Sequence, residues 1–291
     1  MLSELNGIEI AELILLIAGA VMLIASALAV TARRAWGRRL RLEQPPPNRL
    51  EPSDLLLGFI AVLLLPAVAV ALSSEFDGAD GSTQPPDDAL PIAATAQLAL
   101  AALGQAIGIV ILLGIGRERF SGGLGGWGLS ARSAMRRLGS AALVYVMIWP
   151  ICFGLLHASV WSIRWVWPGF EPDEHSTIEM LMRAETPAAS RWLLIVTAAV
   201  LAPFAEELFF RGILLPALAG RFRSTWAATM VTAIAFGAMH YAVPQTVPAL
   251  IALGLALGYV YLRTRSLTLS ILIHMVFNAK SILWLALGAA S

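Results

Sequence analysis

Apolar residues dominate eight runs along the chain, each close to the length of a helix that crosses a bilayer, about 20 residues. Shorter segments rich in Arg, Gly or Pro separate these runs. A segment inside a bilayer must satisfy its backbone polar groups internally, so we expect each run to be a helix. The expected spans are 12–32, 55–72, 92–115, 138–162, 192–218, 226–241, 248–262 and 267–288. The pattern predicts an all-α fold, a polytopic membrane helical bundle of about eight transmembrane helices.

The composition agrees with this prediction and narrows the functional classes. Of the 291 residues, 58% are hydrophobic and 13% are charged, and the mean hydropathy is +0.76. Soluble domains are about 45–50% apolar and about 25% charged. The net charge is +1 and no basic run indicates a nucleic-acid partner. The single cysteine, Cys152, excludes an internal disulfide and a multi-cysteine metal site.

The basic residues predict the orientation. Of the 20 Lys and Arg residues, 15 lie in the loops that follow the first, third, fifth and seventh runs. The positive-inside rule places these loops in the cytoplasm and both termini outside it. A composition rich in Arg, with Lys280 as the one lysine, favours a bacterial plasma membrane. We expect Lys280 to extend its ammonium group toward the outer membrane surface.

Three charged residues lie inside the fifth run, where charge is most costly. Glu206 and Glu207 are adjacent, and Arg211 follows four residues after Glu207. An i,i+4 pair with the acid first is the favourable orientation for an ion pair on a helix. This pairing leaves Glu206 without a local counter-ion. An ionisable residue in a membrane span is a functional candidate by default, so Glu206 is a candidate general base.

Two later runs supply polar partners for these charges. His240 ends the sixth run, and His274 and Asn278 are four residues apart on one face of the eighth. Placing them against lipid would be very unfavourable, so we expect all of them to converge with the carboxylates in the bundle interior. A carboxylate, two imidazoles and a carboxamide can activate water and donate hydrogen bonds to an oxyanion, as peptide hydrolysis requires. Alternatively, Glu207 and Arg211 form a structural ion pair and the histidines are satisfied core residues.

A glycine-rich turn between the third and fourth runs has the residue spacing of a dinucleotide-binding fingerprint but not its structural context. Gly123, Gly125 and Gly128 have the G-x-G-x-x-G spacing, but no predicted strand precedes them. We therefore expect a flexible cytoplasmic turn and no cofactor site.

The polar residues fall in three motifs that together resemble the CPBP family of CAAX prenyl endopeptidases and bacteriocin-processing, or Abi-type, membrane proteins. The motifs are EELFFRG at 206–212, FGAMH at 236–240 and HMVFN at 274–278, and they occur in separate spans. The resemblance covers approximately 192–287. It implies a division of the single membrane domain into three N-terminal helices without a motif, 1–137, and a catalytic helical core, 138–291.

The family resemblance implies intramembrane peptidase activity without a covalent intermediate, and it implies a role for each motif residue. Glu206 is then the general base, and His240 helps to bind the nucleophilic water. His274 and Asn278 form the oxyanion site, with Glu207 and Arg211 as a supporting pair. All six motif positions match.

The residues leave metal dependence open. Glu206, His240 and His274 are a possible three-ligand zinc set with an open fourth position. However, no His-Glu-x-x-His motif is present, and the Asn278 amide suits an oxyanion better than zinc. We expect catalysis without a cofactor and keep zinc as the alternative.

The predicted function is therefore an intramembrane endopeptidase that cleaves a membrane-embedded or membrane-associated peptide or protein. The first alternative is a non-proteolytic scaffold that binds partner membrane proteins with the same bundle. A proton-coupled transporter is a third possibility, but the sequence shows no inverted repeat to favour it.

Overall fold

The computed structural model describes residues 7–35, 42–68, 71, 89–172, 181, 186–222 and 224–288. Helices account for all the regular structure in this part of the chain, where the one β-bridge joins Asn48 and Phe120. The elements are α1 (Gly7–Ala35), α2 (Pro52–Phe59), η2 (Ile60–Leu64), α4 (Ala89–Arg119), α5 (Gly123–Gly126), α6 (Ala131–Val166), α8 (Ala188–Val196), η3 (Thr197–Leu201), α9 (Ala202–Phe209), η4 (Phe210–Leu214), α10 (Leu215–Phe222), α11 (Thr225–Ala238), η5 (Pro244–Thr246), α12 (Val247–Thr264) and α13 (Leu267–Gly288).

Each of the eight predicted spans contains a helix, so the prediction of an all-α membrane bundle is confirmed. Within the described residues, six helices are long and apolar enough to cross a membrane, and two apolar helices, 52–68 and 225–238, are shorter. The segment 188–222, which holds the two adjacent glutamates, forms one rod of 35 residues from α8 to α10. We call this rod the glutamate helix.

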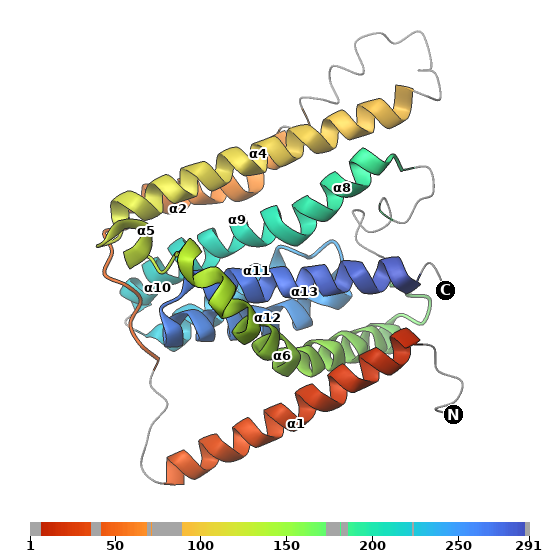
Figure 1. Cartoon of the computed structure of the whole chain (residues 1–291), viewed down its shortest axis with the longest axis horizontal. Helices are drawn as coiled ribbons and strands as arrows, with labels where there is room; N and C mark the ends of the chain where they lie inside the picture. The colour runs from red at the N-terminus through yellow and green to blue at the C-terminus, as the bar shows by residue number, and fades with distance from the viewer. Residues whose placement is uncertain are drawn as a thin grey trace.

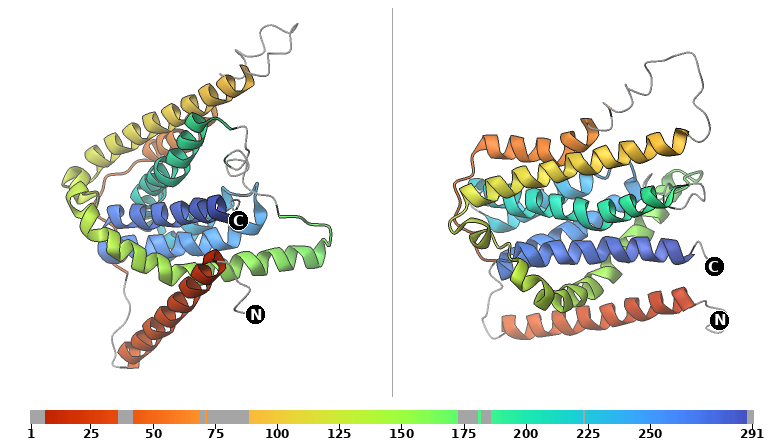
Figure 2. Two further views of the ribbon diagram at one scale, coloured as in Figure 1. Left: turned by 45° about the vertical axis from the view of Figure 1, so that its right-hand side comes forward. Right: turned by 45° about the horizontal axis from the view of Figure 1, so that its top comes forward.

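The glutamate helix lies inside the bundle (Figures 1 and 2). On one side it is covered by α2 and α4, and on the other by α11, α12 and α13, with α6 and then α1 beyond them. The start of α1 and the end of α13 lie at the same end of the bundle, as an even number of crossings requires. The ends of α4 and α10 and the α12–α13 turn, which hold Arg119, Arg221 and Arg265, lie at the opposite end. The cytoplasmic location of that end stays a prediction.

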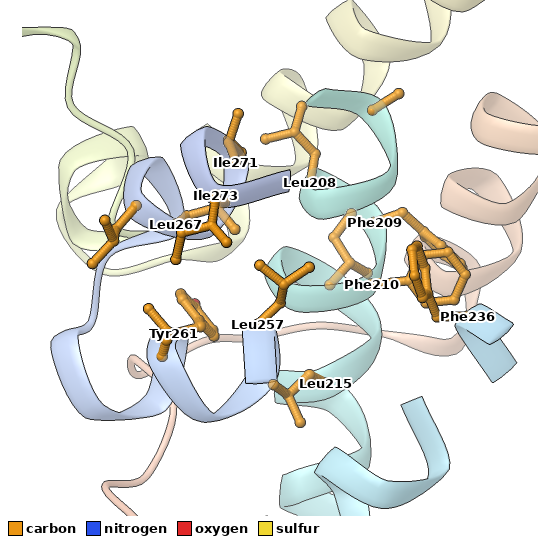
Figure 3. Close-up of a cluster of buried hydrophobic side chains, with 14 of the residues drawn as sticks. Leu208, Phe209, Phe210, Leu215, Phe236, Leu257, Tyr261, Leu267, Ile271 and Ile273 are labelled. Carbon is orange, nitrogen blue, oxygen red and sulfur yellow. The ribbon is translucent and has the colours of Figure 1, made fainter. Parts of the chain in front are cut away.

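The hydrophobic core is built around the glutamate helix (Figure 3). Leu208 and Phe210 from that helix lie among Phe236 of α11, Leu257 of α12 and Ile273 of α13, all of them at most 1% exposed. In contrast, only 6% of the apolar window of α1 is buried inside the protein. Helix α1 therefore contributes little to the core, and the core that positions polar groups comes from the other helices.

The prediction that Lys280 extends toward the membrane surface is wrong. Its Nζ lies 2.7 Å from Glu12 Oε2 of α1, and the side chain is only 9% exposed. The indole Nε1 of Trp149 donates to the other Glu12 oxygen at 2.5 Å. The ring centroids of Trp149 and Trp284 lie 3.4 and 4.6 Å from the ammonium nitrogen. An acid from a helix distant in sequence holds the charge inside the bundle, where cation–π contacts also stabilise it.

Candidate active site

The glutamate helix departs from α-helical geometry on both sides of Glu206 and Glu207. The π-helical segments η3 and η4 precede and follow α9, which contains the two carboxylates. Prolines stand close to both segments, Pro203 after η3 and Pro216 after η4. Single π turns inside α-helices occur frequently at functional sites. Proline also lacks an N–H, so each one removes a backbone donor from the helix.

The first of these irregularities explains the position of Asn278. The Ala202 N–H bonds to Thr197 O, five residues back, and the next residue, Pro203, has no N–H. The Ala198 carbonyl thereby loses both backbone donors that a helix would offer it. The Asn278 Nδ2 donates to this carbonyl at 2.9 Å. The amide of α13 thus satisfies a break in the glutamate helix, and its second N–H remains for another acceptor.

The predicted pair between Glu207 and Arg211 is present and fully buried. Arg211 Nη1 lies 2.5 Å from Glu207 Oε1, and the side chains are 2% and 0% exposed. Arg211 Nη2 donates to the carbonyl of Gly254 in α12 at 3.2 Å. The guanidinium carbon also lies 4.6 Å from the ring centroid of Phe236. One arginine therefore links α11, α12 and the glutamate helix.

His274 lies between the two glutamates. Its Nδ1 is 3.1 Å from Glu207 Oε1, and its Nε2 is 3.8 Å from Glu206 Oε2. A carboxylate only accepts hydrogen bonds, so Nδ1 carries the proton and donates to Glu207. The Nε2 atom therefore faces Glu206. The Glu206 side chain is 17% exposed, and no donor in the described part of the chain lies within hydrogen-bond distance of it.

His240 joins the group through an aromatic ring. Its Nδ1 donates to the carbonyl of Phe236 at 3.1 Å, which leaves Nε2 as an acceptor in the neutral ring. The centroid of the Phe236 ring lies 5.4 Å from that of His240 and 5.5 Å from that of His274. The structure thus brings Glu206, Glu207 and His274 together directly, and places His240 beside them across Phe236.

Sequence reasoning missed the groups that hold these side chains. Gly254 of α12 packs closely against α11. A Cβ there would lie 3.0 Å from Ala233 Cα, so close packing is present. Its use as an acceptor for Arg211 was not predicted. For the Ala198 carbonyl, the only sequence signal is the nearby Pro203. For the Phe236 ring, it is the position of Phe236 in the FGAMH motif.

A three-ligand metal set is not assembled in the described residues. No group of three His, Cys, Asp or Glu side chains there is arranged to hold a metal ion, and this includes Glu206, His240 and His274. Catalysis without a metal stays a prediction, and we derive no step through a metal.

Residues 188–280 match the family model described as type II CAAX prenyl endopeptidase Rce1-like. This segment, 93 of the 291 residues, is similar to that family, and we refer to it as the Rce1-like domain. It contains all six candidate residues, Glu206, Glu207, Arg211, His240, His274 and Asn278. At the level of the family, the match supports a CAAX-type intramembrane protease. No curated protein and no solved structure matches the chain. Helices α1, α2, α4, α5 and α6 lie outside the Rce1-like domain.

Proposed function

We propose that the protein hydrolyses a peptide bond of a membrane-associated protein or peptide, with water activated by Glu206. One observation carries the proposal: the Glu206 carboxylate has no hydrogen-bond donor among the described residues and faces His274 Nε2 at 3.8 Å. A partly buried carboxylate in a structural role is expected to be hydrogen-bonded. An unsatisfied one next to an imidazole nitrogen is suited to hold and deprotonate a water molecule.

The reaction begins when Glu206 takes a proton from water and the oxygen attacks the scissile carbonyl carbon. The C=O bond becomes a C–O⁻ bond in the tetrahedral intermediate. The C–O⁻ electron pair then re-forms the C=O bond as the C–N bond breaks, and Glu206 gives its proton to the leaving amine nitrogen. No covalent bond to the protein forms at any stage.

The remaining polar residues bind the water and the oxyanion. His240 presents Nε2 as an acceptor for a water hydrogen, because its Nδ1–H is used by the Phe236 carbonyl. Asn278 has one amide N–H left for the oxyanion after its bond to Ala198 O. His274 donates to the oxyanion from Nε2 when both ring nitrogens carry protons, with its Nδ1–H bonded to Glu207.

The substrate is proposed to reach the site from the bilayer or its surface, since the glutamate helix is enclosed by other apolar helices. We place the protein in a bacterial plasma membrane with both termini outside the cytoplasm, from the distribution of its arginines. The proposal includes no metal or organic cofactor.

The protein reconstituted in lipid vesicles, with farnesylated and unmodified peptides ending in a CAAX sequence, tests the proposed function. We expect the wild type to cleave at least one peptide and Glu206→Gln to cleave none. Glu12→Gln is a matched control, because Glu12 is a partly buried glutamate with the same 17% side-chain exposure as Glu206. Equal cleavage by the wild type and Glu206→Gln would contradict the role of Glu206. Binding of peptides without cleavage by the wild type would favour the scaffold.

A further inference from the structure

We propose that Trp127, which lies outside the Rce1-like domain, is a positioning residue for the reaction. Its indole N–H supplies the hydrogen bond that Pro216 cannot give to the glutamate helix, and so holds the turn that carries Arg211. This proposal rests on the proposed function, because the positioned residue belongs to the proposed active site.

The Trp127 side chain lies between two helices, at positions where each helix has a glycine. The residue follows α5 in the glycine-rich turn and is fully buried. A Cβ at Gly116 of α4 would lie 2.0 Å from the indole ring, and a Cβ at Gly212 would lie 2.4 Å from it. The ring is therefore in direct contact with the backbones of α4 and the glutamate helix. The prediction of a flexible turn is wrong, because this side chain anchors the turn in the core.

The indole donates to a carbonyl that lacks its usual helical donor. Trp127 Nε1 lies 2.7 Å from Gly212 O. In an α-helix this carbonyl would accept from the residue four positions later, which is Pro216 and has no N–H. Buried carbonyl groups need a partner, and here the partner comes from a different helix connection. The arrangement parallels that of Asn278 at the other π segment.

The Gly212 carbonyl is one residue from the charged site. Arg211 and Gly212 both belong to η4, and Arg211 bonds to Glu207, which orients His274. A shift of the Gly212 peptide moves the base of the Arg211 side chain directly. Because reacting groups tolerate little displacement, this shift is expected to lower the rate of the chemical step.

The turn is also attached to the helix that contains His274. The Thr268 N–H donates to Gly128 O at 3.2 Å, and the Ser130 N–H donates to Thr268 Oγ1 at 2.8 Å. Gly128 adopts φ +93°, and a Cβ there would lie 2.5 Å from Arg265 O. Through these contacts the turn joins the start of α13 to the glutamate helix, the two elements whose relative position sets the site.

A double-mutant cycle tests the proposal. Trp127→Phe keeps an aromatic ring between the two helices and removes the N–H, whereas Pro216→Ala returns a backbone N–H to the glutamate helix. We expect Trp127→Phe to lower kcat by roughly 10- to 100-fold at equal folded amounts, with KM little changed. Adding Pro216→Ala to Trp127→Phe is expected to restore kcat to within about threefold of the wild type. Full activity of Trp127→Phe, or a loss that Pro216→Ala leaves unchanged, would overturn the proposal.

A second variant separates positioning from general loss of stability. Trp149→Phe also removes an indole donor, here a partly buried one that bonds to Glu12. We expect it to lower Tm without lowering kcat, whereas Trp127→Phe lowers kcat. Equal losses of kcat in the two variants would contradict a specific role. A wild type that cleaves nothing contradicts the proposed function, whereas an active wild type with a fully active Trp127→Phe contradicts only the positioning role.

Discussion

Two clusters of buried charge lie in this bundle, and they differ in whether their carboxylate oxygens accept hydrogen bonds. The site cluster consists of Glu206, Glu207, Arg211 and His274. The Lys280 cluster consists of Glu12, Trp149, Lys280 and Trp284. Glu206 and Glu12 have the same side-chain exposure, 17%. Exposure alone therefore does not distinguish the two carboxylates.

The partners of the carboxylate oxygens do distinguish them. In the Lys280 cluster, one oxygen of Glu12 accepts from the Trp149 indole and the other from the ammonium group of Lys280. In the site cluster, Glu206 faces only His274 Nε2 at 3.8 Å, and the buried Oε2 of Glu207 has no hydrogen-bond partner among the described residues. The unpaired buried polar atom of the Lys280 cluster is a donor, the Trp284 indole Nε1. A carboxylate with both oxygens bonded joins helices, whereas one without donors retains capacity for water and substrate.

The largest expected effect is the loss of activity in Glu206→Gln. The amide is nearly isosteric and cannot accept a proton from water, so kcat should fall by at least about 10²-fold, the lower end of general-base contributions. Folding should be unaffected, because the carboxylate satisfies no other group in the described structure. Single-turnover cleavage and Tm measured on the same preparation check both parts. Wild-type kcat in Glu206→Gln would show that the Glu206 carboxylate has no catalytic role, and the two clusters would then not differ in function.

Arg211→Met should lower both activity and stability. It leaves the fully buried Glu207 without its counter-ion, which typically lowers the free energy of unfolding by about 3–5 kcal/mol. Arg211→Lys is the informative companion, because a lysine cannot reproduce the two directed bonds to Glu207 and to the Gly254 carbonyl. Denaturation in mild detergent gives the stability, and residual cleavage per folded molecule gives the activity. Wild-type stability in Arg211→Met would contradict the geometry described for the pair.

Lys280→Met should affect stability and leave the chemistry intact. The substitution removes a charge-assisted hydrogen bond to Glu12, worth about 1.5–3 kcal/mol, and loosens the attachment of α1. At equal folded amounts we expect wild-type kcat. A fall in kcat of about 10-fold or more in a folded Lys280→Met protein would show that the Lys280 cluster takes part in function.

The smallest expected effect is that of metal removal. Because no three-ligand group is assembled among the described residues, prolonged dialysis against a chelator should leave cleavage unchanged. Loss of cleavage that added Zn²⁺ restores, with Mg²⁺ as the control ion, would contradict this expectation.

The sequence predicted the parts of the molecule that depend on short-range spacing. Apolar runs of bilayer length gave the helices, and the i,i+4 spacing of Glu207 and Arg211 gave the ion pair. Boundaries were less accurate: α6 begins at Ala131, where we expected a span from 138, because its first turns are rich in arginine. Hydropathy detects only the apolar part of a helix, so it misses polar turns that extend the helix beyond the membrane-spanning region.

Contacts between distant segments were not predictable in the same way. Trp127 and Gly212 are 85 positions apart, and Glu12 and Lys280 are 268 apart. A proline signals that a carbonyl loses its donor, but the sequence does not identify which distant side chain replaces it. For the same reason the contact between His274 and Glu207 emerged only from the packing of α13 against the glutamate helix.

The most direct test of the central claim compares newly formed protein N-termini in membranes from cells that express the wild type, Glu206→Gln or Glu12→Gln at equal abundance. We expect a set of termini that is present with the wild type and Glu12→Gln and absent with Glu206→Gln. These termini would also identify the substrate and its cleavage site. The same set of termini in all three membranes would contradict proteolysis by Glu206 and would favour a scaffold on the same fold.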